Sequence, residues 1–433
     1  MSTLVTIAGA ILALAEAMFY IFYRLYLLPH MNAPSRAPPY PGKCSRSDFI
    51  LRILRRIENE GSAEDNERMK IKKFLRGWFF DIEFEAILQG NIVEFLAWAM
   101  FSKHTGCLES DERLQIEKVL EYVATVYSIK FTEGYNETAK CARLNLEPVS
   151  PLHRPLLFYV AISFLALISS VVLNSLGFRK RKTRNQLVYW VRSGTNPALS
   201  PLIFFHGIAP ACHFPYIPLL HYLLSNNERS ALLVENNCVS MTMNMDPLTE
   251  FGVVDGIQLA TARHFPTNKK FVLMGHSVGT CPITWCLRAF PESVEKIFLL
   301  DPVTLLLSNH DVAVNFLYRK SYKTISEIVI DLFASKEMFT RTFLGRHFFW
   351  FRNELWLEDV PGHVETTILI AGKDEIVNGE SVRRLVESLK LKSKNDEKQI
   401  DLIYRESLTH AGMLLDRSIY SELRSNLSSC LKG

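Results

Sequence analysis

The sequence predicts an α/β architecture in which a mostly parallel β-sheet, with helices on both faces, follows a membrane-anchored helical region. Two observations carry this prediction. From residue 186 onward, short continuous apolar runs alternate with helical stretches, which is the pattern of parallel strands buried on both faces. Before that point, two long apolar runs flank a segment with helical periodicity, and runs of that length are typical of membrane helices.

The expected strands are apolar, and each is short enough to be a strand rather than a helix. They lie near residues 187–191, 201–205, 231–234, 271–274, 296–300, 366–371 and 400–404. Helices are expected between them, near residues 248–264, 278–290, 379–389 and 413–427.

Composition excludes several classes of function. The chain has 433 residues, which indicates more than one structural unit. Its 49 basic and 45 acidic residues leave a net charge of +4, and no basic stripe interleaved with aromatics points to nucleic acid. The eight cysteines are scattered without metal-ligand spacing, so we expect free thiols in a reducing compartment and no metal site.

Residues 1–31 are expected to form a transmembrane anchor. The apolar stretch from Leu4 to about Leu28, at roughly 1.5 Å per residue, can cross a bilayer core of about 30 Å. Glu16 lies inside it, where a carboxylate is costly. A cleaved signal peptide is the alternative, but no basic residue precedes the run and the run continues past Ala17.

Residues 32–154 are expected to be helical, after a proline-rich linker from Asn32 to Ser47. Apolar residues recur there at spacings of three and four, and the stretch from Phe74 to Phe101 is rich in aromatics. A helical hairpin packing its own core is the favoured interpretation, and an amphipathic helix at a membrane surface is the alternative.

Residues 155–178 contain a second apolar run, which a basic cluster follows at once between Arg179 and Arg184. Hydropathy favours a membrane helix with the cluster on the cytoplasmic side. A re-entrant or interfacial segment, or a buried core helix, is the alternative, although the length disfavours a core helix.

Residues 271–279 carry the chemistry. Phe271-Val-Leu-Met-Gly-His-Ser277-Val-Gly279 is a strand followed by G-x-S-x-G and then a helix, which is the pattern of a nucleophile elbow. A strained turn lifts the serine hydroxyl above the sheet, and the flanking glycines leave room for the neighbouring strand and helix. The competing interpretation is a glycine-rich turn with an incidental serine.

On these residues, the region 186–433 resembles the α/β-hydrolase superfamily, and its layout is similar to that of membrane-anchored α/β-hydrolase-domain lipases and esterases. The resemblance implies a fold with a Ser-Asp-His triad that needs no cofactor. The strand ending in Phe205-His-Gly-Ile208 matches the loop that supplies one oxyanion donor. The implied donors are the backbone N–H groups of Ile208 and Val278, with His206 only bracing the turn.

The resemblance also implies the other two members of the triad. Asp374 ends the apolar strand at 366–371 and matches the family's usual acid, while Glu375 is expected to point elsewhere. Asp301 also ends a strand and is the alternative acid, although the proline after it favours a turn anchor. His410 follows the final strand, so the chain order Ser277, Asp374, His410 matches the fold.

An insertion at about residues 302–361 is rich in aromatics and matches the position of the superfamily's cap. Such a cap implies an apolar pocket for an acyl chain, although it could equally dip into lipid or be a well-packed subdomain.

The sequence therefore predicts a membrane-bound serine hydrolase that cleaves an acyl ester through an acyl-enzyme. The expected substrate is a lipid. The alternatives are an amidase, thioesterase or acyltransferase on the same fold, or a non-catalytic scaffold. The expected partners are the apolar substrate and the bilayer, without nucleic acid; nothing in the sequence indicates an oligomeric state.

Two charge signals bear on topology, and they conflict if both apolar runs cross the membrane. The basic excess after the second run places the catalytic domain in the cytoplasm, with the endoplasmic reticulum as a candidate membrane. The segment between the runs would then be lumenal, and Asn136 would be a glycosylation acceptor. However, Arg24, Arg36 and Lys43 follow the first run and draw that segment toward the cytoplasm. An interfacial second run removes the conflict.

Overall fold

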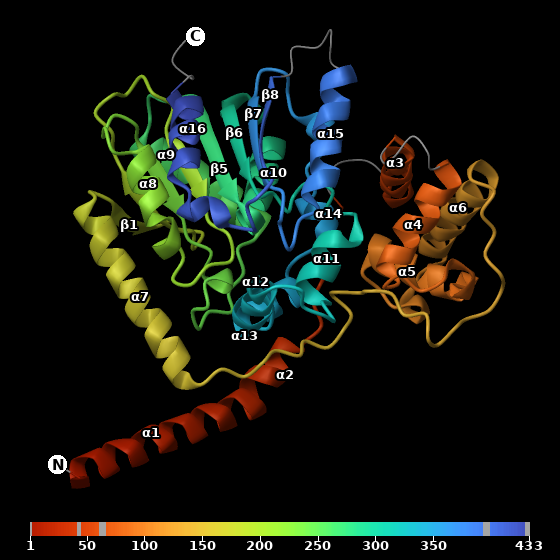
Figure 1. The fold of residues 1–433 in the computed structure, drawn as a ribbon, viewed down its shortest axis with the longest axis horizontal. Coiled ribbons are helices and arrows are strands. Elements are labelled where there is room, and N and C mark those ends of the chain that lie inside the picture. The colour runs from red at the N-terminus through yellow and green to blue at the C-terminus, as the bar shows by residue number, and fades with distance from the viewer. Residues whose placement is uncertain (1, 41–44, 60–65, 393–398, 429–433) are drawn as a thin grey trace.

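An eight-stranded sheet forms the centre of the catalytic region in the computed structural model, which describes residues 2–40, 45–59, 66–392 and 399–428 (Figure 1). The strand order is β1-β2-β4-β3-β5-β6-β7-β8. Strand β2 runs antiparallel to β1 and to β4, and the remaining pairs are parallel. The strands are β1 (Arg179–Lys182), β2 (Val188–Arg192), β3 (Leu202–Phe205), β4 (Ala231–Val234), β5 (Phe271–His276), β6 (Val294–Leu300), β7 (Glu365–Ala371) and β8 (Ile400–Arg405).

The seven strands expected from the sequence are all present, but β1 was not predicted. Its four residues belong to the basic cluster that hydropathy assigned to the flank of a membrane helix. They instead pair antiparallel with β2, from Arg179 opposite Val191 to Lys182 opposite Val188, and all four are exposed. Charged residues are a common way of protecting an edge strand. The sheet therefore begins before the predicted domain boundary at residue 186.

Helices cover both faces of the sheet, which explains why its strands are continuously apolar. Alternate residues such as Ile203 and Phe204 belong to different core clusters on opposite faces. One face packs against α9 (Glu250–His264), α10 (Cys281–Ala289) and α15 (Gly379–Lys392). The other packs against α8 (Ile217–Leu223) and α16 (Arg417–Ser428).

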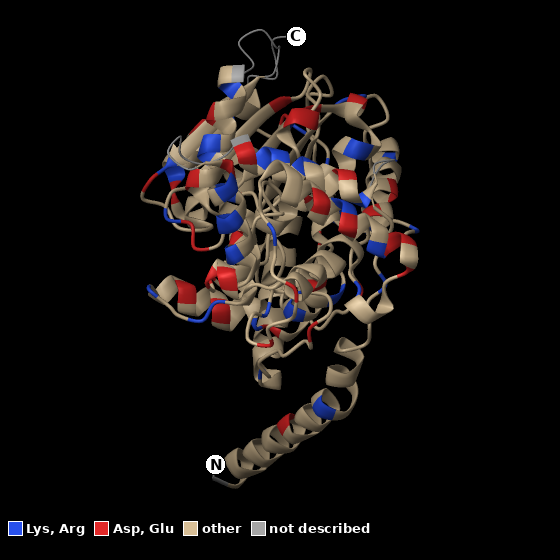
Figure 2. Cartoon of the chain, turned by 90° about the vertical axis from the view of Figure 1, so that its right-hand side faces the viewer, with Lys and Arg blue, Asp and Glu red and all other residues tan. Residues whose placement is uncertain are grey.

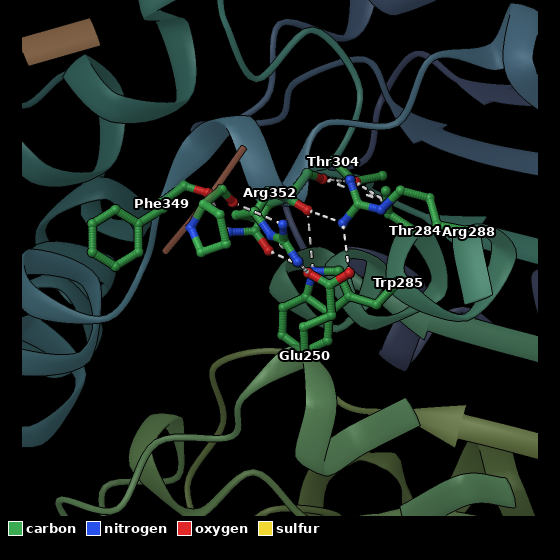
Figure 3. A network of polar contacts seen from close by, with 9 residues as sticks. Glu250, Thr284, Trp285, Arg288, Thr304, Phe349 and Arg352 are labelled. Atoms are coloured by element: carbon green, nitrogen blue, oxygen red, sulfur yellow. Dashed lines mark hydrogen bonds and ion pairs between the residues drawn. The ribbon is translucent and has the colours of Figure 1, made fainter. Parts of the chain in front are cut away.

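Residues between β6 and β7 form a helical insertion, which we call the cap. It contains α11 (His310–Leu317), α12 (Ile325–Ile330) with η8 (Asp331–Ser335), α13 (Met338–Arg346) and α14 (Trp350–Asn353). A polar network fastens the cap to the core, as Figure 3 shows. Arg352 of α14 donates from Nε to Glu250 of α9 at 2.8 Å, and Arg288 of α10 contacts both residues. The hydroxyls of Thr284 and Thr304 lie 2.8 Å apart in the same network.

The helices between the two apolar runs pack against the cap and share its hydrophobic core (Figure 1). They are α3 (Arg46–Asn59), α4 (Glu67–Trp78), α5 (Gln89–Phe101) and α6 (Ser110–Val126), and we call them the helical region. Several of its aromatic side chains, including Trp78, Phe79 and Trp98, are buried. Arg56 pairs with Glu354 at 2.6 Å, and both side chains are almost inaccessible to solvent. The helical region and the catalytic region are therefore one packed body.

Two helices of the described residues are long and apolar enough to cross a membrane. The first comprises α1 (Ser2–Phe22), η1 (Tyr23–Leu27) and α2 (Leu28–Met31), and the second is α7 (Leu156–Ser175). Figure 2 shows α1 projecting from the rest of the chain with hardly any charge. Its one carboxylate, Glu16, accepts a hydrogen bond from the Leu156 N–H at the start of α7, at 2.7 Å. The cost of placing Glu16 in an apolar helix is thereby reduced.

Free thiols were expected from the scattered cysteines. Cysteines 107, 141, 212, 238, 281 and 286 are free. Cys44 and Cys430 lie outside the described residues.

Candidate active site

Ser277 sits on a sharp turn between β5 and α10. Its φ of +52° lies in the left-handed region, which is strained for a residue with a side chain. Both flanking glycines are required by close packing. A Cβ on Gly275 would collide with the carbonyl of Gly279, and a Cβ on Gly279 would collide with the carbonyl of Phe205. The sequence G-x-S-x-G therefore folds into a turn that presents the serine hydroxyl at the end of the strand.

His410 joins Ser277 to Asp374. Its Nε2 lies 3.0 Å from Ser277 Oγ, and its Nδ1 lies 2.7 Å from Asp374 Oδ2. The three side chains come from the loops after β5, β7 and β8, at the carboxyl ends of parallel strands. The structure thus brings together the three residues that the sequence proposed as nucleophile, acid and base, in hydrogen-bonding order.

Backbone groups hold Asp374 in place. Its Oδ1 accepts the N–H groups of Ile376 and Val377, each at 2.8 Å, so that Oδ2 is left for the imidazole. Glu375 was expected to point away from the position of the triad acid, and its carboxylate bonds the backbone of His410 rather than the imidazole. Its Oε2 accepts the backbone N–H of His410 at 2.9 Å, because the loop after β8 folds back over the end of β7. Adjacent carboxylates thus fix the side chain and the backbone of the same histidine.

The charge around His410 favours its protonated form. Burial lowers the pKa of the imidazole, but the negative charges of Asp374, Asp301 and Glu375 outweigh burial and raise the pKa to about 9. An imidazolium is therefore well stabilised at this position, which is the charge state a general base acquires when it takes a proton.

Asp301, the alternative acid, is buried beside the same histidine but accepts hydrogen bonds from elsewhere. Its Oδ1 accepts the N–H of Ala371 at 2.9 Å, and its Oδ2 accepts the N–H of Ala411 at 3.1 Å. The Nε2 of His276 lies 3.7 Å from Oδ2. Burial opposes ionisation, but contacts with His276, His410 and the Ala371 N–H keep the pKa of Asp301 below its usual value. Asp301 joins the end of β7 to the His410 loop.

The loop after β3 lies against the nucleophile. A Cβ on Gly207 would stand 3.0 Å from the Cβ of Ser277, so Ile208, the next residue, is close to the serine. Ile208, Ser277 and Val278 line the same cavity. Within the described chain, no hydrogen-bond acceptor is found for the Ile208 N–H. Ile208 and Val278, the proposed oxyanion donors, therefore both border the space beside Ser277.

A buried chain of polar contacts supports that loop, and sequence reasoning missed two of its members. The Tyr216 hydroxyl accepts the Gly207 N–H at 2.9 Å and lies 2.7 Å from Nδ1 of His276. His276 in turn faces Asp301. His276 is the variable residue inside G-x-S-x-G, and Tyr216 belongs to no motif. Its role depends on the packing of α8, which a single sequence does not reveal.

His206 has the bracing contacts expected of a turn histidine. Its Nδ1 lies 2.7 Å from the Gly207 carbonyl, and its Nε2 accepts the Asn236 N–H at 2.9 Å. Burial lowers the pKa of His206 to about 4, so the ring is neutral and both nitrogens are occupied.

Asp301, Asp374 and His410 are also the one group of described residues with the spacing of metal ligands, since their ligand atoms lie within 4.8 Å of one another. Their polar atoms are already engaged. Each carboxylate oxygen accepts a hydrogen bond, and both imidazole nitrogens have partners. The arrangement fits proton transfer better than metal binding.

An apolar cavity opens beside Ser277, and we call it the Ser277 cavity. It encloses about 670 Å³ of unfilled space, counted together with its open mouth. Cap residues form most of its wall, including Val312 and Phe316 of α11 and Leu344 of α13. The cap therefore contributes apolar side chains to the cavity beside the nucleophile.

The strand order and the turn at Ser277 define residues 179–428 as an α/β-hydrolase fold. No protein-family model and no curated protein matches the chain. Among solved structures, the chain is similar to a membrane phospholipase A described as a bacterial virulence factor, at 14% identity and a TM-score of 0.44, covering 64% of this chain and 94% of the other.

Two esterases from Bacillus subtilis are also similar. Carboxylesterase CesB shares 15% identity at a TM-score of 0.38, covering 63% of this chain and 98% of the other. Naproxen esterase shares 14% identity at a TM-score of 0.40, covering 61% and 97%. Similarities this distant concern the fold alone, so the function proposed below rests on the residues of this chain.

Proposed function

We propose that the chain is a membrane-bound serine hydrolase that cleaves the acyl ester of a lipid. The observation that carries the proposal is the continuous hydrogen-bonded order Ser277, His410, Asp374, with distances of 3.0 and 2.7 Å, at the mouth of an apolar cavity. A nucleophile within hydrogen-bonding reach of a base, which an acid orients in turn, is the arrangement that covalent acyl transfer requires.

In the first half-reaction, Ser277 Oγ attacks the ester carbonyl and His410 Nε2 takes the hydroxyl proton. The carbonyl oxygen becomes an alkoxide, which the N–H groups of Ile208 and Val278 stabilise. Asp374 holds the imidazolium by its Nδ1–H. The tetrahedral intermediate collapses when His410 returns the proton to the leaving alcohol, and the acyl group stays on Ser277.

In the second half-reaction, water replaces the alcohol. His410 removes a proton from the water as it attacks the acyl carbon, and the same N–H groups stabilise the second alkoxide. The proton then goes to Ser277 Oγ, which leaves with its bond to the acyl carbon broken. A carboxylic acid is released and the enzyme is restored. An amine or a thiol as the leaving group gives the amidase or thioesterase alternative, and a second alcohol in place of water gives the acyltransferase alternative.

A serine-reactive fluorophosphonate tests the proposal against a non-catalytic scaffold. The purified chain in detergent should be labelled, and it should hydrolyse p-nitrophenyl butyrate. Both activities should disappear in Ser277→Ala. Absence of labelling and of ester turnover in the wild-type chain would overturn the proposal.

The shared core supports a specific membrane arrangement, in which α1 crosses the bilayer and α7 runs from its contact with Glu16 back to the membrane surface without crossing. Residues on both sides of α7 belong to one hydrophobic cluster, and Arg52 of the helical region pairs with Asp359 of the cap at 2.7 Å. A segment crossing the bilayer would separate these partners. The outer face of α7 is apolar and more than half exposed at Leu157, Val160, Phe164, Leu167 and Val171, which suits an interfacial helix.

This arrangement removes the conflict between the two charge signals. If α1 alone crosses, Arg24 and Arg36 follow it directly, with Lys43, which lies outside the described residues, further along. The rule that basic flanks stay in the cytoplasm then places the helical and catalytic regions there together.

A further inference from the structure

A second apolar cavity lies next to the Ser277 cavity, inside the helical region, and we call it the distal cavity. It lies among α3, α4, α5 and α6, and about 600 Å³ of its space, open solvent included, is not filled by atoms. Ile53 of α3, Ala99 of α5 and Val123 of α6 are among the residues that line it alone. Three tryptophans, Trp78, Trp98 and Trp350, line both cavities. They form the partition between them.

The partition is firmly held at one of these tryptophans. The indole N–H of Trp78 donates to the Ser308 carbonyl at 3.2 Å. The indole N–H groups of Trp98 and Trp350 are buried and lack an acceptor in the described part of the chain. Packing alone therefore holds these two rings, so a small rotation of either would break no hydrogen bond.

The two cavities offer almost nothing to a polar ligand. Asn145 and Ser277 are the polar residues of the first, and Ser308 is the polar residue of the second. Asn145 already donates to the Phe348 carbonyl at 3.1 Å, and Ser308 donates to Glu354 at 2.9 Å. Of these three residues, only Ser277 has its proposed role in the reaction with the ester. An unbranched hydrocarbon attached at Ser277 is the occupant that this lining fits, because its carbons bring in no polar group that would need a partner.

We propose that the helical region is the distal half of the acyl-binding site, so that the enzyme selects esters of long unbranched acyl chains. This inference rests on the hydrolase function proposed above. The carbonyl end sits at Ser277, the proximal carbons fill the Ser277 cavity, and the distal carbons pass Trp98 and Trp350 into the distal cavity. The region before the catalytic domain, which resembles no family by its sequence, thereby acquires a role in choosing the substrate.

The test is a series of p-nitrophenyl esters with acyl chains of four, eight and sixteen carbons, given to the full chain in detergent. Each buried CH₂ strengthens binding by a factor of roughly four, so wild-type kcat/KM should rise along the series. Ala99→Phe on α5 and Val123→Phe on α6 fill the distal cavity from two of its helices. Each should lower the ratio of C16 to C8 turnover at least tenfold. Ala313→Phe, which fills the Ser277 cavity, should lower the ratio of C8 to C4 turnover instead.

Leu114→Phe is the matched control, because Leu114 lies on the exposed face of α6 and its substitution should leave both ratios as in the wild type. The inference is overturned if the wild-type chain prefers C4 to C16, or if the distal variants change the C16 to C8 ratio no more than Leu114→Phe does. Either result, obtained with an active and labelled Ser277, leaves the hydrolase function standing. If the wild-type chain neither labels nor hydrolyses C4, both proposals fall. Should the phenylalanine variants not fold, the wild-type preference alone decides.

Discussion

Ser277 combines a strained backbone with a buried side chain, so stability and activity respond differently to its replacement. At a φ of +52°, a residue with a Cβ is destabilised by about 1 kcal/mol relative to glycine. We expect Ser277→Ala and Ser277→Gly both to lose fluorophosphonate labelling and ester turnover. Ser277→Ala should unfold near the wild-type temperature, and Ser277→Gly should be more stable than Ser277→Ala by about 1 kcal/mol. Turnover persisting in either variant would show that the nucleophile lies elsewhere.

The two buried aspartates should give opposite phenotypes. Asp374→Asn keeps the shape but favours the wrong tautomer of His410, and we expect kcat to fall about ten-thousandfold, as in other triads. The Asp301 carboxylate accepts two backbone N–H groups, one on each oxygen, and the amide of Asp301→Asn has a single oxygen to accept them. It should destabilise the fold by about 1–3 kcal/mol and cost less activity. Urea unfolding and kcat measured on both variants check this, and exchanged phenotypes would make Asp301 the acid.

His410 should give the labelling reaction a steep alkaline dependence. Only the neutral imidazole accepts the Ser277 proton, and its pKa is raised to about 9 from an ordinary 6.5. The rate of labelling should therefore rise with pH and level off above about 9. Asp301→Asn removes one of the charges that raise this pKa, so its midpoint should move to lower pH. A midpoint at 6.5 in the wild-type chain would mean that the carboxylates do not act on His410.

The same shift has a consequence for stability. Because the pKa of His410 is higher in the folded chain, protonated His410 contributes stability that is fully present below its ordinary pKa of 6.5. That contribution is lost as the pH rises through about 9. The free energy of unfolding should thus fall over this window, and less so in His410→Gln.

Among individual residues, the sequence predicts those whose role follows from their position directly after a strand. Ser277, Asp374 and His410 each follow a predicted strand, and parallel strands bring their carboxyl ends to one edge of the sheet. Tyr216, His276 and Glu375 support that site through contacts across the fold, so their neighbours in sequence carry no sign of their roles.

At the scale of elements, the contact between α4 and α11 fastens the helical region to the cap. A Cβ on Gly77 of α4 would collide with the imidazole of His310 on α11. We expect Gly77→Val to lower the free energy of unfolding by about 1–3 kcal/mol through overpacking. His310→Ala in the same chain should recover most of that loss, because it removes the colliding ring. Urea unfolding of the four chains of the cycle measures the coupling. If Gly77→Val lowers the free energy of unfolding equally with and without the His310 ring, α4 and α11 are not in contact at these residues.

Elements with a strong intrinsic pattern were predictable, and one without a pattern was not. The central strands are apolar runs bounded by turns, because both of their faces are buried. Strand β1 is a run of four basic residues that pairs only because β2 offers an open edge. The aromatic stretch of the helical region fitted both a packed core and a membrane surface. The arrangement around α3, α4 and α5 depends on tertiary contacts with the cap, such as that between Arg56 and Glu354, which helical periodicity does not contain.

At the scale of the molecule, the hydrophobic core shared by the helical region and the cap decides against a crossing by α7, although hydropathy favours one. The second apolar run is more hydropathic than the first, with a mean hydropathy of 2.6 against 2.0, and by that measure it should span. Yet the segments before and after it are packed together, so a single crossing there would require the core to divide. Asn136 is also occupied, since its Nδ2 donates to the Ala86 carbonyl at 2.9 Å. We therefore expect both regions on the cytoplasmic side and no glycan on Asn136.

Sealed microsomes that contain the full chain test this topology. Added protease should reach the helical region and the segment after Lys182 without detergent, because neither is enclosed. An N-terminal extension carrying an Asn-x-Thr acceptor, long enough to clear the bilayer, should be glycosylated while Asn136 is not. If the segment after Lys182 is protected until detergent is added, the catalytic domain is lumenal and the charge argument fails. If only one of the two regions is protected, α7 spans the bilayer and the packed body joining them does not exist in the membrane.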